Sequence, residues 1–135
     1  MAKPWITLAS VATDEGPLEL RQRDADDFLI VVAGRVLMSS KAHRSEIEVA
    51  SLACQRLEGI ANPRVLIGGL GMGYTLRAAL DHCPSSATVC VAELNADVVE
   101  WCQGPLAPLT NDALSDPRVR LHVGDVAALI RQTTR

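Results

Sequence analysis

The feature that most constrains the fold is the stretch from Arg64 to Arg77, in which a short apolar run leads into a cluster of glycines. Val65, Leu66 and Ile67 are apolar, four glycines follow within six residues, and helix-forming residues resume at Leu76. This order predicts a strand, a tight turn and the start of a helix. Glycine permits positive φ and lets a ligand lie against the main chain, and the free N–H groups of a helix start favour an electronegative ligand group.

Two carboxylates follow this turn, each after a further apolar run. The turn contains three glycines at alternate positions: Gly69, Gly71 and Gly73. Glu93 closes the run 88–92, twenty residues after Gly73, and Asp125 follows the run 119–123. A carboxylate after the second strand, about 20 residues beyond the glycine turn, is placed to accept hydrogen bonds from ribose hydroxyls. We therefore expect three strand ends to line one nucleotide pocket, with Asp125 serving as a helix N-cap, as a ligand contact, or as both.

The remaining elements predict an α/β core behind a small antiparallel sheet. Four strand-like segments come first: Trp5–Val11, Leu18–Arg23, Phe28–Val32 and Arg35–Met38. Ala33-Gly34 is typical of a tight hairpin turn, and residues 1–42 are expected to form this β region, with the core at 43–135. The first helix is predicted to begin at Ser45, which forms a capping box with Glu48, and to end at Gly59. A second helix follows the glycine turn and runs to about His82, a third follows Asn95 as its N-cap, and the last runs from Val126 to about Gln132.

On these residues the chain resembles the class I S-adenosylmethionine-dependent methyltransferase fold, and within it spermidine synthase and its relatives. The segments that carry the resemblance are Ile67–Gly73, Val91–Asn95, and Asp116–Val119 with Gly124-Asp125. The resemblance covers roughly residues 17–130. It implies a Rossmann-like parallel sheet, of which this chain holds the N-terminal half. It also implies S-adenosylmethionine or its decarboxylated form as cofactor, a polyamine or other amine as acceptor, and a homo-oligomer such as a dimer.

The resemblance also implies roles for the candidate site residues. The three glycines would approach the amino-acid or aminopropyl part of the ligand, Glu93 would hold the ribose, and Asp125 would reach the adenine amino group. Spermidine synthases usually carry an aspartate where this chain has Met72, and a Tyr-His-Glu stretch where it reads Val49-Ala50-Ser51. Their catalytic aspartate follows a fourth strand, which is expected to lie beyond Arg135. The catalytic residue is thus unknown, and the chain alone is expected to be inactive.

Composition excludes several other classes. A formal net charge of −3 gives no reason to expect nucleic acid or an anionic membrane surface as partner. No apolar stretch approaches the 18 residues of a membrane span, and Asp14 and Glu15 come too early for a signal peptide, so a cytoplasmic protein is expected. The four cysteines form no Cys-x-x-Cys pair, which favours buried free thiols and no metal site.

The sequence leaves two alternatives open. The first is a non-catalytic Rossmann-like domain that works by association, and the second, weaker one is an NAD(P)-binding domain, whose Gly-x-Gly-x-x-Gly fingerprint is not matched here. The continuous apolar run 65–67 is typical of a strand in the middle of a sheet. We therefore expect its open edge to be covered by a second copy of the chain or by the N-terminal β segment.

Overall fold

The structure, a computed structural model, describes residues 3–133 of the chain. It divides into two compact units, Met1–His43 and Arg44–Arg135. Each unit has its own sheet. None of the helices among the described residues combines the length and the apolar composition that crossing a membrane requires.

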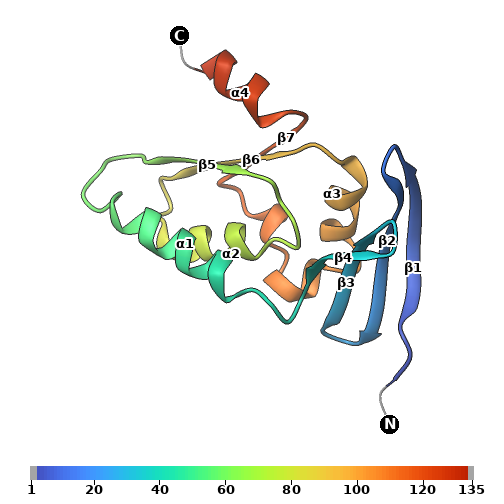
Figure 1. The fold of residues 1–135 in the computed structure, drawn as a ribbon. Helices are drawn as coiled ribbons and strands as arrows, with labels where there is room; N and C mark the ends of the chain where they lie inside the picture. Colours follow the sequence, from blue (N-terminus) through green and yellow to red (C-terminus); the bar gives the residue numbers. More distant parts are fainter. Residues whose placement is uncertain (1–2, 134–135) are drawn as a thin grey trace. The chain divides into compact units, whose positions relative to one another are not determined.

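The N-terminal unit is a four-stranded antiparallel sheet with the order β1-β2-β3-β4. Its strands are β1 (Ile6–Thr13), β2 (Gly16–Asp24), β3 (Asp27–Val32) and β4 (Arg35–Ser39) (Figure 1). Leu20, Phe28 and Ile30 on the two middle strands are almost fully buried. Ala33 and Gly34 both have positive φ, 50° and 81°, as a two-residue hairpin turn requires. The predicted hairpin is therefore confirmed.

The C-terminal unit is a three-stranded parallel sheet with helices on both faces, which confirms the predicted Rossmann-like α/β class. Its main elements are α1 (Arg44–Gln55), β5 (Arg64–Gly68), α2 (Tyr74–His82), β6 (Thr88–Glu93), α3 (Ala96–Gln103), β7 (Val119–Val123) and α4 (Val126–Thr133). Two short 3-10 helices, η1 (Ala107–Thr110) and η2 (Ala113–Ser115), precede β7. The order is β5-β6-β7, with α1, α2 and α3 on one side of the sheet and α4 on the other (Figure 1).

Helix starts follow the sequence signals in one case and depart from them in another. Asn95 caps α3 as predicted, because its Oδ1 accepts a hydrogen bond from the backbone N–H of Asp97 at 2.8 Å. The predicted capping box at Ser45 is wrong, since α1 already begins at Arg44 and Ser45 lies inside its first turn. The Ser45 hydroxyl donates to the neighbouring Glu46 carboxylate at 3.3 Å instead. A capping serine must precede the first helical residue, which this one does not.

Strand β5 lies at the edge of the parallel sheet and pairs with β6 alone among the described residues. Strands β1 to β4 form a separate sheet, so β5 does not pair with the N-terminal β segment. Ile67 is buried, but Leu66 is 42% exposed. Coverage of β5 by a second copy stays a prediction.

Candidate functional site

The glycine turn joins β5 to α2 and is closed by backbone hydrogen bonds. The N–H of Gly69 donates to the carbonyl of Ala92 on β6 at 2.7 Å, and that of Gly73 donates to Leu70 at 2.9 Å. All three candidate glycines have positive φ, which is 99° at Gly69, 56° at Gly71 and 91° at Gly73. The values at Gly69 and Gly73 would strain any residue with a side chain, so the backbone itself favours glycine at these two positions. The value at Gly71 is one that non-glycine residues of this chain also adopt, such as Asn62 at 52°.

Gly69 and Gly73 differ in what surrounds them. A Cβ placed on Gly69 would meet no atom within 4 Å, so this side of the turn is open to a ligand. A Cβ on Gly73 would lie 3.2 Å from Cγ2 of Thr110, which belongs to η1. Gly73 therefore also allows close packing of the 3-10 segment against the start of α2. Nothing in the sequence indicates this contact, because the two residues lie far apart in the chain.

Glu93, at the end of β6, connects the glycine turn to the start of α3. Its Oε1 accepts a hydrogen bond from the backbone N–H of Leu70 at 3.0 Å, and its Oε2 accepts one from Asn95 at 2.9 Å. Each carboxylate oxygen has further acceptor capacity, and the residue is only half-buried. The carboxylate thus fixes the turn while it can still accept hydrogen bonds from a ligand.

Cys102, on α3, stabilises the glycine turn through a side-chain hydrogen bond. Its buried thiol donates to the carbonyl of Gly71 at 3.2 Å. Burial raises the pKa of Cys102 to about 12, and the charge of Glu93 acts in the same direction. The thiol therefore stays protonated at neutral pH and remains a donor.

Asp125 follows β7 and caps α4. Its Oδ1 accepts a hydrogen bond from the backbone N–H of Ala127 at 3.0 Å, so the N-cap role is confirmed. The preceding Gly124 donates its N–H to the carbonyl of Glu93 at 2.8 Å, which ties the end of β7 to the end of β6. Asp125 itself is exposed. Its proposed contact with adenine stays a prediction.

The five candidate residues therefore all lie at the carboxyl ends of the parallel strands. In a Rossmann-like sheet this edge is where nucleotides bind. Met72, by contrast, is buried at 4% exposure, so the turn offers no polar side chain at that position. Among the described residues, no group of three or more His, Cys, Asp or Glu side chains is arranged to hold a metal ion.

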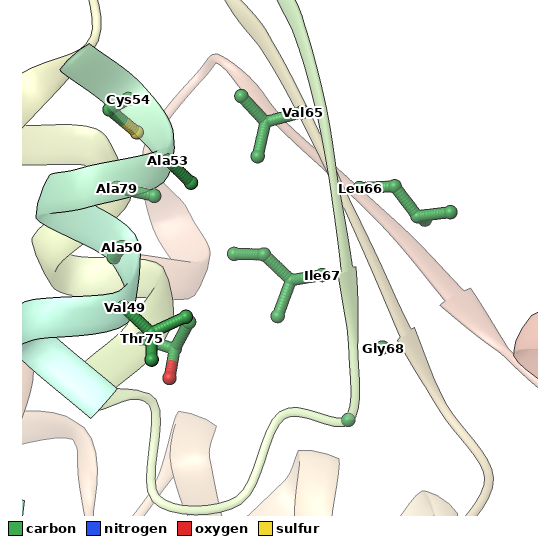
Figure 2. A pocket seen from close by; sticks show the side chains of 11 residues that line it. Val49, Ala50, Ala53, Cys54, Val65, Leu66, Ile67, Gly68, Thr75 and Ala79 are labelled. Carbon is green, nitrogen blue, oxygen red and sulfur yellow. The ribbon is translucent and has the colours of Figure 1, made fainter. Parts of the chain in front are cut away.

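A groove of about 290 Å³ runs beside this site, between α1, β5 and α2 (Figure 2). Its lining is almost entirely apolar, with Val49, Val65 and Ile67 facing the space and Thr75 as the one hydroxyl. Neither Glu93 nor Asp125 lines it. Gly69 does line it, so the groove adjoins the candidate nucleotide site at the glycine turn but contains no carboxylate for ribose hydroxyls.

The fold matches that of spermidine synthases. The spermidine synthase of Thermotoga maritima superposes with a TM-score of 0.72 at 21% sequence identity, over 93% of this chain and 42% of that one. A spermidine synthase in complex with the transition state analogue AdoDATO gives the same TM-score and identity, over 93% and 43%.

The chain is also similar in sequence to a known protein over a shorter stretch. The chain is 38% identical to a polyamine aminopropyltransferase of Clostridium tetani over 65 residues, which are 47% of this chain and 23% of that protein. No protein-family model matches the chain. The chain is thus an α/β protein of the spermidine synthase fold. In sequence it is spermidine synthase-like over part of its length, and it spans less than half of the solved structures that it matches.

Proposed function

We propose that the chain is the adenosyl-nucleoside-binding portion of a spermidine synthase-like aminopropyl- or methyltransferase. The observation that carries this proposal is the Glu93 carboxylate, which lies at the carboxyl edge of the sheet and bonds the glycine turn. A carboxylate in that position suits the two hydroxyls of a ribose. The open side of Gly69 leaves room for the group attached to the nucleoside.

The chemistry of such an enzyme is mainly positioning. S-adenosylmethionine or its decarboxylated form carries an electrophilic carbon on a sulfonium, which must lie in line with a nucleophilic amine. The residues of this chain would hold the nucleoside end: the glycine turn and Glu93 at the ribose, and Asp125 at the adenine. A polyamine or another amine is the proposed acceptor, since the Clostridium tetani relative is named as a polyamine aminopropyltransferase.

Calorimetric titration tests the proposal directly. S-adenosylmethionine and methylthioadenosine should bind, and NAD should bind more weakly. Tighter binding of NAD would overturn the assignment in favour of a dinucleotide-binding domain.

A separate assay addresses turnover. The chain alone should form no spermidine from putrescine and decarboxylated S-adenosylmethionine, because buried Met72 supplies no carboxylate to hold an amine. Spermidine formed above a protein-free control would contradict this reasoning.

The open edge of β5 supports a second candidate function, association with another copy of the chain. An antiparallel pair of β5 strands centred on Leu66 would place Arg64 opposite Gly68, so no like charges would meet across the pair. Strand addition of this kind satisfies the free backbone groups of an edge. A dimer is therefore proposed as the oligomeric state.

The cytoplasm is the proposed location. All four cysteines are free in the structure. Unpaired thiols are typical of a reducing compartment. Cell fractionation that recovered the protein with secreted or periplasmic material would contradict this proposal.

A further inference from the structure

Two cysteine thiols meet where α1 packs against the end of α2. Cys54 lies in the last turn of α1, and Cys83 directly follows α2. Their Sγ atoms are 3.6 Å apart. A disulfide needs about 2.05 Å between the sulfurs, so the two atoms would have to approach by about 1.5 Å. The sequence indicates no such pair, because the two cysteines are separated by the whole β5–turn–α2 segment.

The backbone of Cys83 is held firmly in place. Its N–H donates to the carbonyl of Ala79 at 3.0 Å, and its own carbonyl accepts from Nη1 of Arg118 at 2.9 Å. Arg118 also bonds the carbonyl of Leu80 and pairs with the Asp116 carboxylate at 2.8 Å. Closure of the sulfur gap therefore falls mainly on side-chain rotation rather than on movement of the end of α2.

A small oxidant can reach the pair. A cavity of about 490 Å³ is lined by both cysteines, together with residues of the turn that follows α1 and with Pro84. Cys54 is 4% exposed, whereas Cys83 is half-buried. Burial and the neighbouring Cys83 thiol raise the pKa of Cys54 to about 11, which keeps Cys54 protonated at neutral pH. The more exposed Cys83 is then the sulfur that reacts first.

We propose that Cys54 and Cys83 form a reversible disulfide when the protein meets hydrogen peroxide. In the first step the Cys83 sulfur attacks one peroxide oxygen, the O–O bond breaks, and sulfenic acid and one water form. In the second step the Cys54 sulfur attacks the sulfenic sulfur, the S–O bond breaks, and the disulfide and a second water form. Peroxide takes up the two electrons that the thiols lose, and a dithiol reductant reverses the reaction.

The disulfide would join the two ends of the segment that carries the glycine turn. The closed loop runs from residue 54 to residue 83 and includes all of β5, the glycine turn and all of α2. Closing a loop of this length restricts the unfolded chain and stabilises the folded unit. Oxidation should thus raise the melting temperature by several degrees, and this effect does not depend on nucleotide binding.

Peptide mapping after oxidation tests the proposal. Trypsin cuts after arginine and releases Cys54 in residues 45–56 and Cys83 in residues 78–118, a peptide that also contains Cys90 and Cys102. After peroxide treatment and alkylation, mass spectrometry should find these two peptides joined. The number of free thiols should fall from four to two, since one disulfide consumes two. The Cys83→Ser variant should lose the linked species, and the Cys90→Ser control should retain it.

The alternative is that the two sulfurs are only an apolar contact. Peroxide treatment that oxidises thiols without linking these peptides would overturn the proposal, as would linkage that persists in Cys83→Ser. A dimer band on a non-reducing gel would also overturn it, because the cross-link would then be between chains. Circular dichroism of both serine variants establishes that they are folded. Cys83 is only half-buried, so serine is tolerable there.

Discussion

The Glu93→Gln variant tests how far one carboxylate organises the site. The carboxylate accepts backbone hydrogen bonds at 3.0 Å from Leu70 and 2.9 Å from Asn95. Glutamine keeps one acceptor oxygen, but this oxygen is uncharged, so the hydrogen bond that it accepts is weaker. The NH₂ group of glutamine replaces the other oxygen and faces the second backbone N–H, which is also a donor. Loss of charge assistance costs roughly 1 kcal/mol and a donor facing a donor about as much again, giving about 2 kcal/mol of unfolding free energy.

Urea denaturation followed by tryptophan fluorescence measures this loss. Trp5 and Trp101 are the two tryptophans of the chain, so a Trp5→Phe background leaves buried Trp101 on α3 as the reporter of the C-terminal unit. In that background Glu93→Gln should lower the free energy of unfolding by about 2 kcal/mol. The control is Glu100→Gln, the same chemical change at an exposed position of α3, which should shift stability by less than about 0.5 kcal/mol.

Ligand affinity separates the two roles of the carboxylate. If Glu93 also holds ribose hydroxyls, the variant that remains folded should bind methylthioadenosine about 5- to 30-fold more weakly, equivalent to about 1 to 2 kcal/mol. Equal stability of Glu93→Gln and Glu100→Gln would refute the structural role. Unchanged affinity would show that Glu93 is a strand end without a ligand.

Three further predictions follow from other contacts. Hydrogen bonding to Arg118 lowers the pKa of Asp116 from 3.8 to about 2, so the ion pair stabilises the fold above pH 4 and this stabilisation is lost as the pH falls toward 2. Asp116→Asn should therefore cost about 1 to 2 kcal/mol of unfolding free energy at pH 7 and almost nothing near pH 2. A difference in urea denaturation that does not change with pH would contradict this. Gly73→Ala should lower the free energy of unfolding by about 2 kcal/mol in the same assay. The loss should be smaller for Gly59→Ala, because Gly59 has a similar φ of 80° but open space around it. Equal losses would exclude a steric contribution from Thr110. Sedimentation should show self-association with slow amide exchange at Leu66 and Ile67, and a monomer in which both exchange fast would exclude pairing through β5.

The elements of the core could be predicted from sequence because each has a local signal. The large positive φ values at Gly69 and Gly73 favour glycine, and Asn95 is a strong N-cap. Pro84 comes two residues after the last residue of α2 and marks the end of that helix. A capping box at Ser45 would place the first helical residue at 46, whereas α1 begins at Arg44, so Ser45 lies inside the helix. A shift of this size decides whether a serine caps or not, and propensity alone does not resolve it.

The supporting contacts of the site could not be predicted, because they join residues distant in the chain. Cys102 reaches Gly71, Thr110 packs on Gly73, and the Glu93 carboxylate bonds the N–H of Leu70. The spacing of Glu93 after the turn predicted that it would lie nearby. It did not predict that the carboxylate would hold the turn itself, since that depends on the register of β5 against β6.

The most direct test of the central claim is an NMR titration of the ¹⁵N-labelled chain with methylthioadenosine. Saturable shifts should appear at the amides of Gly69, Gly71 and Gly73 and at those flanking Glu93 and Asp125. Shifts confined to residues of the apolar groove, such as Val49 and Val65, would contradict the proposed site. An absence of shifts at millimolar ligand would contradict nucleoside binding by this chain altogether.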